Sequence, residues 1–407
     1  MITHRTTEVL AVLLALALGS AACTDDDAPS TAVTEQPTTT AAAGPVEVPP
    51  GGDLYALAEP LVPGEPGEVI AVQEVSGIDI DGRVVRVLYH SESIAGADIA
   101  VSGIIVVPSG PAPTGGRTVL SWAHGTTGIA DECAPSKDPE GASIGLVAPF
   151  LERGMVFAAT DYEGLGTPGR HPYIAGVSEG RGVLDIARAA RALGSPVEAS
   201  DEVVVWGHSQ GGHAALFANQ IAATYAPELR VVGTVAGAPP SQLNLIAAAL
   251  KDSPFRHYLG MVAAGWAAAY PDADPADVLT PAGEASLDLV DEGCTGELAA
   301  AWNDVPYDDL VKADPATVEP WRTLLVENDP GFVVGASPIL IIHGEQDEQI
   351  PTVSSQLLLD RMCGIGQVVE RRTYPASHAG VIGPSLPDML AWIDARLAGE
   401  PAPTSCP

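Results

Sequence analysis

The residues best suited to chemistry lie in the stretch Gly207-His208-Ser209-Gln210-Gly211. β-branched residues at 203–205 precede it and an alanine-rich run at 214–218 follows it, which predicts a strand, a sharp turn and a helix with Ser209 at the apex. The flanking glycines leave room at a turn that forces strained backbone angles on the serine. This context favours an activated serine nucleophile, and the alternative is a tight turn with an incidental serine.

A serine hydroxyl needs a base that takes its proton and a third group that orients the base. Of the nine histidines, His378 follows the last predicted strand, 367–374. Loops at the carboxyl edge of a parallel sheet are where an active site is expected. The loop after the preceding strand offers Asp347 as the acid, with Glu345 and Glu348 as competitors. The chain order Ser, Asp, His is that of the α/β-hydrolases.

The other histidines fit the role of the base less well. His208 and His213 flank Ser209, but we expect their side chains to point away from its hydroxyl or beyond it, which leaves His208 as a supporting residue. His343 stands at the end of a predicted strand. The remaining histidines lie in the amino-terminal segment, in the loop described next or in no recognisable motif.

The negative oxygen that forms during acyl transfer needs preorganised N–H donors, the oxyanion hole. One donor is expected to be the backbone N–H of Gln210, which follows the nucleophile. The other is expected from the early loop 121–128, where Gly125 or Thr126 is the donor. The alternative for this His-Gly-Thr sequence is a plain turn.

Short apolar segments bounded by Gly, Pro and Asp predict the strands that position these loops. They cover residues 69–75, 83–89, 99–107, 118–123, 155–160, 203–206, 230–236, 338–342 and 367–374. Besides the helix after Ser209, helices are predicted at 142–153, 178–194, 352–362 and 385–398. This alternation predicts an α/β class fold, the α/β-hydrolase fold, with a mostly parallel sheet covered by helices on both faces.

Residues 240–335 interrupt the alternation. They are rich in alanine, strongly apolar at 244–250 and 258–269, and punctuated by prolines. A structureless loop of this length is implausible, so we expect a helical cap insertion over the carboxyl edge of the sheet. Its apolar faces serve either as ordinary packing or as the lining of an apolar pocket.

The amino terminus predicts export. A basic start, an apolar run at 9–18 and small residues ending at Cys23 form a signal peptide, residues 1–23, that is too short for an ordinary membrane span. It is similar to a bacterial lipoprotein signal, in which Cys23 is lipidated, although Ser20 stands where Leu is usual. Cleavage and release is the alternative. Residues 24–52 predict a disordered Thr/Ala/Pro tether, followed by one hydrolase domain, 53–407.

Charge and cysteines limit the partners. The chain has 19 basic and 52 acidic residues, and the formal net charge of −33 disfavours nucleic acid as a partner. Export permits disulfides, and four cysteines allow three pairings; they are Cys133, Cys294, Cys363 and Cys406. No pair has the spacing of a zinc site, so a metal site is not expected. We expect a monomer, on the cell surface or secreted.

Several stretches together resemble the secretory lipase family of fungi and actinobacteria, within the α/β-hydrolase superfamily. They are residues 123–126, 131–136, 161–166, 207–211, 343–347 and 377–378. The resemblance covers residues 55–406. It implies a secreted lipase or esterase with a helical cap over an acyl-binding tunnel.

The resemblance also implies roles for single residues. Ser209 would be the nucleophile, His378 the general base and later the acid, and Asp347 the residue that orients it. It implies the disulfides Cys133–Cys294 and Cys363–Cys406. In the 161–166 motif, Asp161 and Tyr162 are expected to support the site without reacting.

We therefore predict a serine carboxylester hydrolase that acts on acylglycerols or other lipid esters through an acyl-enzyme and without a cofactor. One alternative is the same triad working as a short-chain esterase, an acyltransferase or a peptidase. A second alternative is a surface-binding module that has the hydrolase fold without catalysis.

Overall fold

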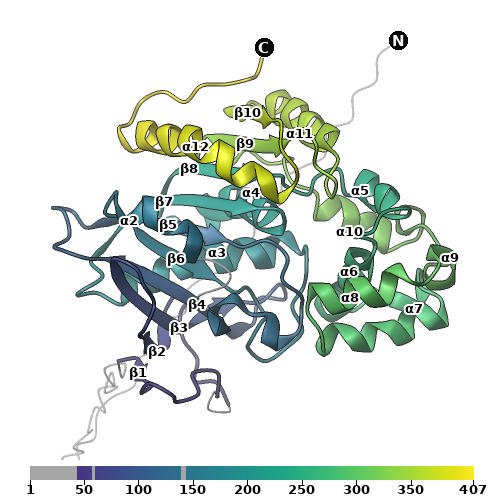
Figure 1. Cartoon of the computed structure of the whole chain (residues 1–407), viewed down its shortest axis with the longest axis horizontal. Coiled ribbons are helices and arrows are strands. Elements are labelled where there is room, and N and C mark those ends of the chain that lie inside the picture. Colours follow the sequence, from purple (N-terminus) through teal and green to yellow (C-terminus); the bar gives the residue numbers. More distant parts are fainter. Residues whose placement is uncertain (1–43, 57–59, 139–143) are drawn as a thin grey trace, which may run out of the picture. The chain divides into compact units, whose positions relative to one another are not determined.

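Ten strands of the described chain form one central sheet (Figure 1). This computed structural model describes residues 44–56, 60–138 and 144–407. The strands are β1 Val46–Glu47, β2 Val69–Val75, β3 Gly82–Glu92, β4 Asp98–Pro108, β5 Arg117–Ala123, β6 Val156–Thr160, β7 Ala199–His208, β8 Arg230–Gly237, β9 Ile339–Gly344 and β10 Val369–Tyr374. Their order in the sheet is β1-β2-β3-β4-β6-β5-β7-β8-β9-β10. The strand predictions are confirmed within a few residues at each end.

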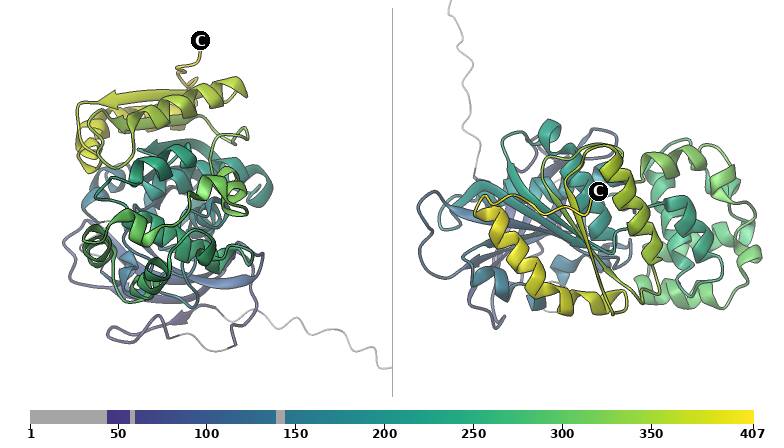
Figure 2. Two further views of the ribbon diagram at one scale, coloured as in Figure 1. Left: turned by 90° about the vertical axis from the view of Figure 1, so that its right-hand side faces the viewer. Right: turned by 90° about the horizontal axis from the view of Figure 1, so that it is seen from above.

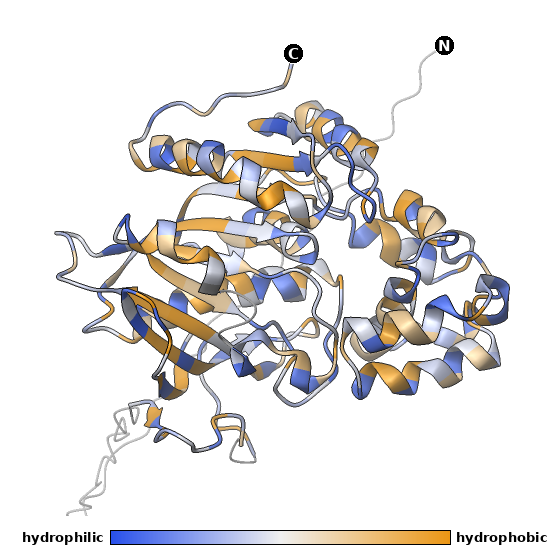
Figure 3. Ribbon diagram, viewed as in Figure 1, coloured by the Kyte–Doolittle hydropathy of each residue, from blue (hydrophilic) through white to orange (hydrophobic). Residues whose placement is uncertain are grey.

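The sheet is mostly parallel, as predicted. All strands from β6 to β10 in this order run in the same direction, whereas β2, β3 and β4 form an antiparallel meander that joins β6. Parallel strands need both faces covered, because their residues are apolar on both sides. Figure 3 shows this apolar character along the central strands.

Helices cover the two faces of the sheet (Figure 2). One face packs against α3 Gly176–Ala192, α4 Gln210–Tyr225 and α11 Thr352–Gly364. The other face packs against α2 Ala148–Leu151 and α12 Ile382–Leu397, which contribute Phe150 and Trp392 to its core. Both cores consist of fully buried aliphatic and aromatic side chains, and this burial is the main stabilising term of the fold.

The insertion after β8 is helical, as predicted. It contains α5 Leu243–Leu250, α6 His257–Ala269, α7 Pro281–Ala285, α8 Thr295–Asn303, α9 Tyr307–Leu310 and α10 Trp321–Glu327. These helices, which we call the cap, lie beyond one end of the strands (Figure 1). They have a core of their own around Trp266, Trp302 and Trp321. None of the helices in the described ranges is long and apolar enough to cross a membrane.

Two predictions about chain segments need correction. The tether was expected to reach residue 52, but Val46–Glu47 pairs with β2, and Gln73 donates to the carbonyls of Pro49 and Gly52. The edge of β2 has free backbone groups that this segment satisfies. Of the helix expected at 142–153, the described residues 144–153 contain a short 3₁₀ turn and the four residues of α2. The signal peptide, Cys23 and most of the tether lie outside the described residues.

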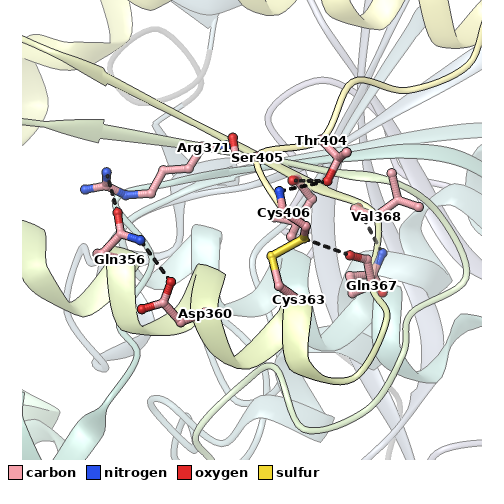
Figure 4. The surroundings of a disulfide bond; sticks show 10 residues. Gln356, Asp360, Cys363, Gln367, Val368, Arg371, Thr404, Ser405 and Cys406 are labelled. Atoms are coloured by element: carbon pink, nitrogen blue, oxygen red, sulfur yellow. Dashed lines mark hydrogen bonds between the residues drawn. A yellow bond between two sulfur atoms is a disulfide. The ribbon is translucent and has the colours of Figure 1, made fainter.

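Two disulfides join the cysteine pairs that the resemblance implies. Cys363 at the end of α11 pairs with Cys406 and fixes the carboxyl-terminal segment (Figure 4). Cys133, in the loop that follows β5, pairs with Cys294 at the start of α8 in the cap. Next to this bond, the N–H of Thr295 donates to the carbonyl of Thr127 at 3.1 Å. The loop after β5 is therefore attached to the cap.

Candidate active site

Ser209 lies on a tight turn between β7 and α4, as the sequence predicts. Its backbone has φ 59° and ψ −123°, a conformation that costs energy in any residue other than glycine. The turn needs the two glycines, because a Cβ atom at Gly207 would lie 1.9 Å from the carbonyl oxygen of Gly211, and one at Gly211 would lie 1.8 Å from that of Ala123. The N–H of Ser209 donates to the carbonyl of Gly237 at 2.8 Å. Backbone contacts therefore fix Ser209.

His378 and Asp347 come together at the ends of neighbouring strands, β10 and β9. Nδ1 of His378 lies 2.7 Å from Oδ2 of Asp347, and both side chains are almost fully buried. The other carboxylate oxygen accepts the N–H groups of Gln349 and Ile350 at 2.9 and 2.8 Å. A carboxylate accepts hydrogen bonds, so Nδ1 carries the proton. This leaves Nε2 of His378 as the basic nitrogen.

A second histidine reaches the same carboxylate. Nε2 of His343 lies 3.1 Å from Oδ2 of Asp347 and 3.0 Å from the carbonyl oxygen of Ile350. Because a carbonyl only accepts, this nitrogen carries a proton. Burial alone would raise the pKa of Asp347, but hydrogen bonds from His343, His378 and backbone N–H groups hold it well below its usual range. Asp347 is therefore ionised.

The competing acids have other partners. Glu345 accepts a hydrogen bond from Thr373, and Glu348 accepts the backbone N–H of His378 rather than its ring. The ring of His208 lies against that of His378, with centroids 4.9 Å apart. Burial, followed by the nearness of His378, lowers the pKa of His208 to about 3, so its ring is neutral. Among the three acids in this loop, Asp347 is the one that bonds the ring.

The loop after β5 lies against the serine turn. A Cβ atom at Gly125 would lie 3.5 Å from Cβ of Ser209 and 3.3 Å from the carbonyl oxygen of His208. The hydroxyl of Tyr162 donates to the carbonyl of His124 at 2.9 Å, which fixes the start of this loop. Gln210 is the first residue of α4, and N–H groups in the first turn of a helix have no acceptor within it. Both expected oxyanion donors thus belong to segments beside Ser209.

Asp161 holds the loop after β5 through buried hydrogen bonds. Its carboxylate accepts the hydroxyl of Ser102 at 2.6 Å, the N–H of Ser136 at 3.0 Å and also the Ser136 hydroxyl. Burial raises the pKa of Asp161, although these hydrogen bonds oppose that effect. Ser136 belongs to the same loop as Cys133, so Asp161 anchors the segment that leads to the disulfide.

Comparison with known proteins identifies the family of this chain. The sequence profile of the secretory lipase family matches residues 140–405, more than half of the chain. The chain belongs to the secretory lipase family. Its matches to named lipases make it a lipase-like carboxylic ester hydrolase.

Two relatives and one solved structure illustrate the range of the family. A secreted triacylglycerol lipase of Malassezia globosa is 29% identical over 301 residues, 68% of this chain and 65% of that protein. A Mycobacterium tuberculosis protein named "Probable inactive lipase" is 24% identical over 387 residues, 88% of this chain and 82% of that one. The structure of Candida antarctica lipase A, 23% identical, covers 84% of each chain with a TM-score of 0.72. The fold is thus the α/β-hydrolase fold.

The chain has an apolar cavity, lined mostly by residues of the cap. Its volume is about 820 Å³, counting its open mouth, and its walls are almost entirely hydrophobic. Tyr173 and Ile350 line the end nearest the site, since the hydroxyl of Tyr173 lies 2.8 Å from Oγ1 of Thr126 and Ile350 donates to Asp347. The rest of the wall comes from the cap and includes Leu243, Ile246, Val262, Trp266, Leu279 and Trp321. The apolar faces of the insertion therefore line a pocket as well as packing together.

Two polar residues beside the site, His343 and Glu179, have no role assigned by the sequence reasoning. For His343, the signal is its position four residues before Asp347 at the end of β9. Glu179 is fully buried in the first turn of α3 and contacts the side chains of Gln210 and His213. Nothing in its local sequence marks it, because it lies in an amphipathic helix and its partners are more than 30 positions away.

Proposed function

We propose that this chain is an exported serine hydrolase that cleaves esters of apolar acyl groups, acylglycerols or similar lipid esters, through an acyl-enzyme on Ser209. The observation that supports it most is the 2.7 Å contact between Nδ1 of His378 and Asp347, next to the strained turn that carries the serine. It leaves Nε2 of the same ring free to take a proton.

The first half of the reaction forms the acyl-enzyme. Oγ of Ser209 attacks the ester carbonyl carbon while Nε2 of His378 takes the hydroxyl proton. The carbonyl oxygen becomes negative and is stabilised by the N–H of Gln210 and by a donor at Gly125 or Thr126. The imidazolium, held by ionised Asp347, then gives its proton to the leaving alcohol as the C–O bond breaks.

The second half returns the enzyme to its starting state. Water enters, His378 takes its proton, and the resulting hydroxide attacks the acyl carbon. The tetrahedral intermediate collapses, and Ser209 recovers its proton from the imidazolium. During both halves the apolar acyl chain lies in the cap cavity. Its binding there is favourable because the apolar surfaces of the chain and of the cavity wall are removed from water.

Export rests on the sequence of the amino terminus and on the two disulfides, which form in oxidising compartments. We propose lipidation at Cys23 rather than release. Labelling of producing cells with a palmitate analogue tests this, because wild type should be labelled and C23A should not. Equal labelling of both proteins would contradict lipidation at Cys23.

Fluorophosphonate labelling with mapping of the modified peptide tests the nucleophile. We expect modification at Ser209, and S209A should lose at least about 10⁴-fold in kcat on p-nitrophenyl esters. Modification elsewhere, or equal turnover by the two proteins, would contradict the assignment. A wild-type protein without esterase activity would favour a non-catalytic module, the state that the name of the mycobacterial relative describes.

An ester series decides the acyl class. We expect turnover of octanoate and longer p-nitrophenyl esters, because the wall of the cavity is almost entirely apolar. Activity confined to acetate and butyrate would make the chain a short-chain esterase instead. Transfer of the acyl group to an added alcohol in preference to water would make it an acyltransferase.

A further inference from the structure

A buried polar cluster connects the start of α4 with α3 and with the cap. At its centre is Glu179, whose side chain is fully buried. One carboxylate oxygen accepts Nε2–H of Gln210 at 2.9 Å and the N–H of Ile174 at 3.0 Å. The other lies 2.8 Å from Nδ1 of His213. Glu179 thus contacts the first and the fourth residue of α4, the helix turn that directly follows Ser209.

The protons in this cluster can be counted from its acceptors. Nε2 of His213 lies 2.7 Å from the carbonyl oxygen of Asn328, which only accepts, so Nε2 carries a proton. The contact between Nδ1 and Glu179 needs one further proton. Whichever of the two atoms holds it, the pair of Glu179 and His213 has no net charge. The Glu179/His213 pair therefore adds no net negative charge beside the oxyanion that forms on the substrate.

The side chain of Gln210 is held at two points. Its second amide hydrogen donates to Nε2 of His171 at 2.8 Å, and Nδ1 of that ring donates to the carbonyl of Glu163. Burial lowers the pKa of His171 to about 4, so the ring is neutral and its Nε2 accepts. With both amide hydrogens committed, Gln210 has one side-chain orientation.

We propose that Glu179 is a positioning residue that fixes the backbone N–H of Gln210 in the oxyanion hole. This inference rests on the proposed function, in which that N–H stabilises the oxyanion. Donors in such a site are effective because they are oriented before the reaction begins. Glu179 supplies this orientation by holding Gln210 directly and by holding His213 one helix turn further on.

The same cluster attaches the cap. The side-chain oxygen of Asn328, at the end of α10, accepts the N–H of Gly176 at 2.9 Å, and its amide nitrogen bonds Tyr270 of the cap at 2.9 Å. Its carbonyl holds His213. The last helix of the cap and the oxyanion donor consequently share one buried support.

Three variants test the proposal on a p-nitrophenyl ester. E179A should lower kcat about 10- to 100-fold, because a small misplacement of a reacting group has effects of this size, with KM changed less than about twofold. E179Q should recover kcat to within about threefold, since its amide can accept from Gln210 and Ile174 and donate to a neutral His213. D185N is the control, a buried carboxylate on the same helix that bonds Ser91 and Tyr225. It should lower the melting temperature without changing kcat.

Several results would overturn the proposal. They are an unchanged kcat in E179A, a loss that comes from KM alone, or a loss in E179Q as large as in E179A. If E179A does not fold, Q210M replaces it, because methionine keeps the backbone N–H and removes the amide. Its kcat should fall by the same factor, and a boronic acid that mimics the tetrahedral intermediate should bind more weakly in parallel. Unchanged kcat and boronic acid binding in Q210M would overturn the proposal equally.

Comparing S209A with E179A distinguishes a failure of the proposed function from a failure of the positioning role of Glu179. If S209A turns over esters as wild type does, the proposed function fails. If S209A is inactive while E179A is fully active, only the positioning role of Glu179 fails.

Discussion

The sheet and the cap hold their residues by different means. Near the ends of the strands, the backbone N–H of Ser209 bonds the carbonyl of Gly237, and the carboxylate of Asp347 accepts two backbone N–H groups. In the cap, short helices are held by apolar packing around three tryptophans. Backbone contacts depend little on side-chain identity, whereas packing depends on side-chain volume. Substitutions at the ends of strands should therefore change the rate, and substitutions in the cap should change which substrate is accepted.

The sharpest change on the sheet side is D347N. The amide would favour the wrong tautomer of His378, in which Nε2 carries the proton, and kcat should fall about 10⁴-fold with little change in KM. Steady-state kinetics at pH 8 measures this, with circular dichroism as the control for folding. A loss below about tenfold would mean that another acid orients the base.

The two disulfides separate the regions directly. Each closes a long loop, and its removal should cost about 4–5 kcal/mol of unfolding free energy. C133A/C294A should also lower kcat/KM about tenfold, because Cys294 holds the loop of Gly125 against the cap. The disulfide Cys363–Cys406 fixes only the carboxyl-terminal segment, so C363A/C406A should keep the wild-type kcat/KM. Chemical unfolding and ester kinetics on both variants measure the two effects, and equal kcat/KM values would contradict the distinction.

Filling the cavity should change specificity on the cap side. In V262W a large ring enters the acyl-binding wall, so kcat/KM for a palmitate ester should fall about tenfold or more relative to butyrate. Val326 is the matched control, a cap valine that is 50% exposed, and V326W should keep the wild-type ratio. The ratio of the two ester rates is the measurement. Equal ratios in both variants would place the acyl chain outside the cavity.

The smallest expected effect is a pH dependence of cap stability. Burial lowers the pKa of His257 in α6 from 6.5 to about 4. Between these values the unfolded chain binds a proton at His257 that the folded cap does not. His257 therefore contributes about 1.4 kcal/mol per pH unit to the fall in unfolding free energy as the pH decreases, beside the contributions of His171 and His208. H257F should lower this slope by about 1.4 kcal/mol per pH unit between pH 6.5 and 4 and leave it unchanged above pH 7. Urea unfolding at several pH values measures the slope, and identical slopes would contradict the assignment.

Most strands and the serine turn could be predicted because their signals are local. The β-branched run before Gly207 and the small residues after Ser209 specify a strand, a turn and a helix by themselves. The strand β1 has only two residues and gives no periodicity, so it was assigned to the tether. α2 is short for two reasons. Pro149 is tolerated only in the first turn of a helix, so the helix cannot begin much earlier, and Gly154 at φ 73° follows its end.

The details of the site depend on contacts that sequence does not display. Three acids follow β9 within four positions, and only the fold of that loop turns Asp347, rather than Glu345 or Glu348, toward His378. Glu179 meets Gln210 through the packing of α3 on α4. For the cap, composition predicts helices, but whether their apolar faces pack or enclose a space depends on how six short helices are arranged.

The attachment of the cap bears on how substrate reaches the site. One side of the cap is bound covalently at Cys294, and the other is bound through the buried contacts of Asn328. The disulfide and the buried hydrogen bonds of Asn328 both oppose a rigid-body opening of the cap. With the cap in this position, the open mouth of the cavity is the expected entrance for ester molecules. We therefore expect velocity to rise smoothly with ester concentration through the solubility limit, with no step where droplets first form.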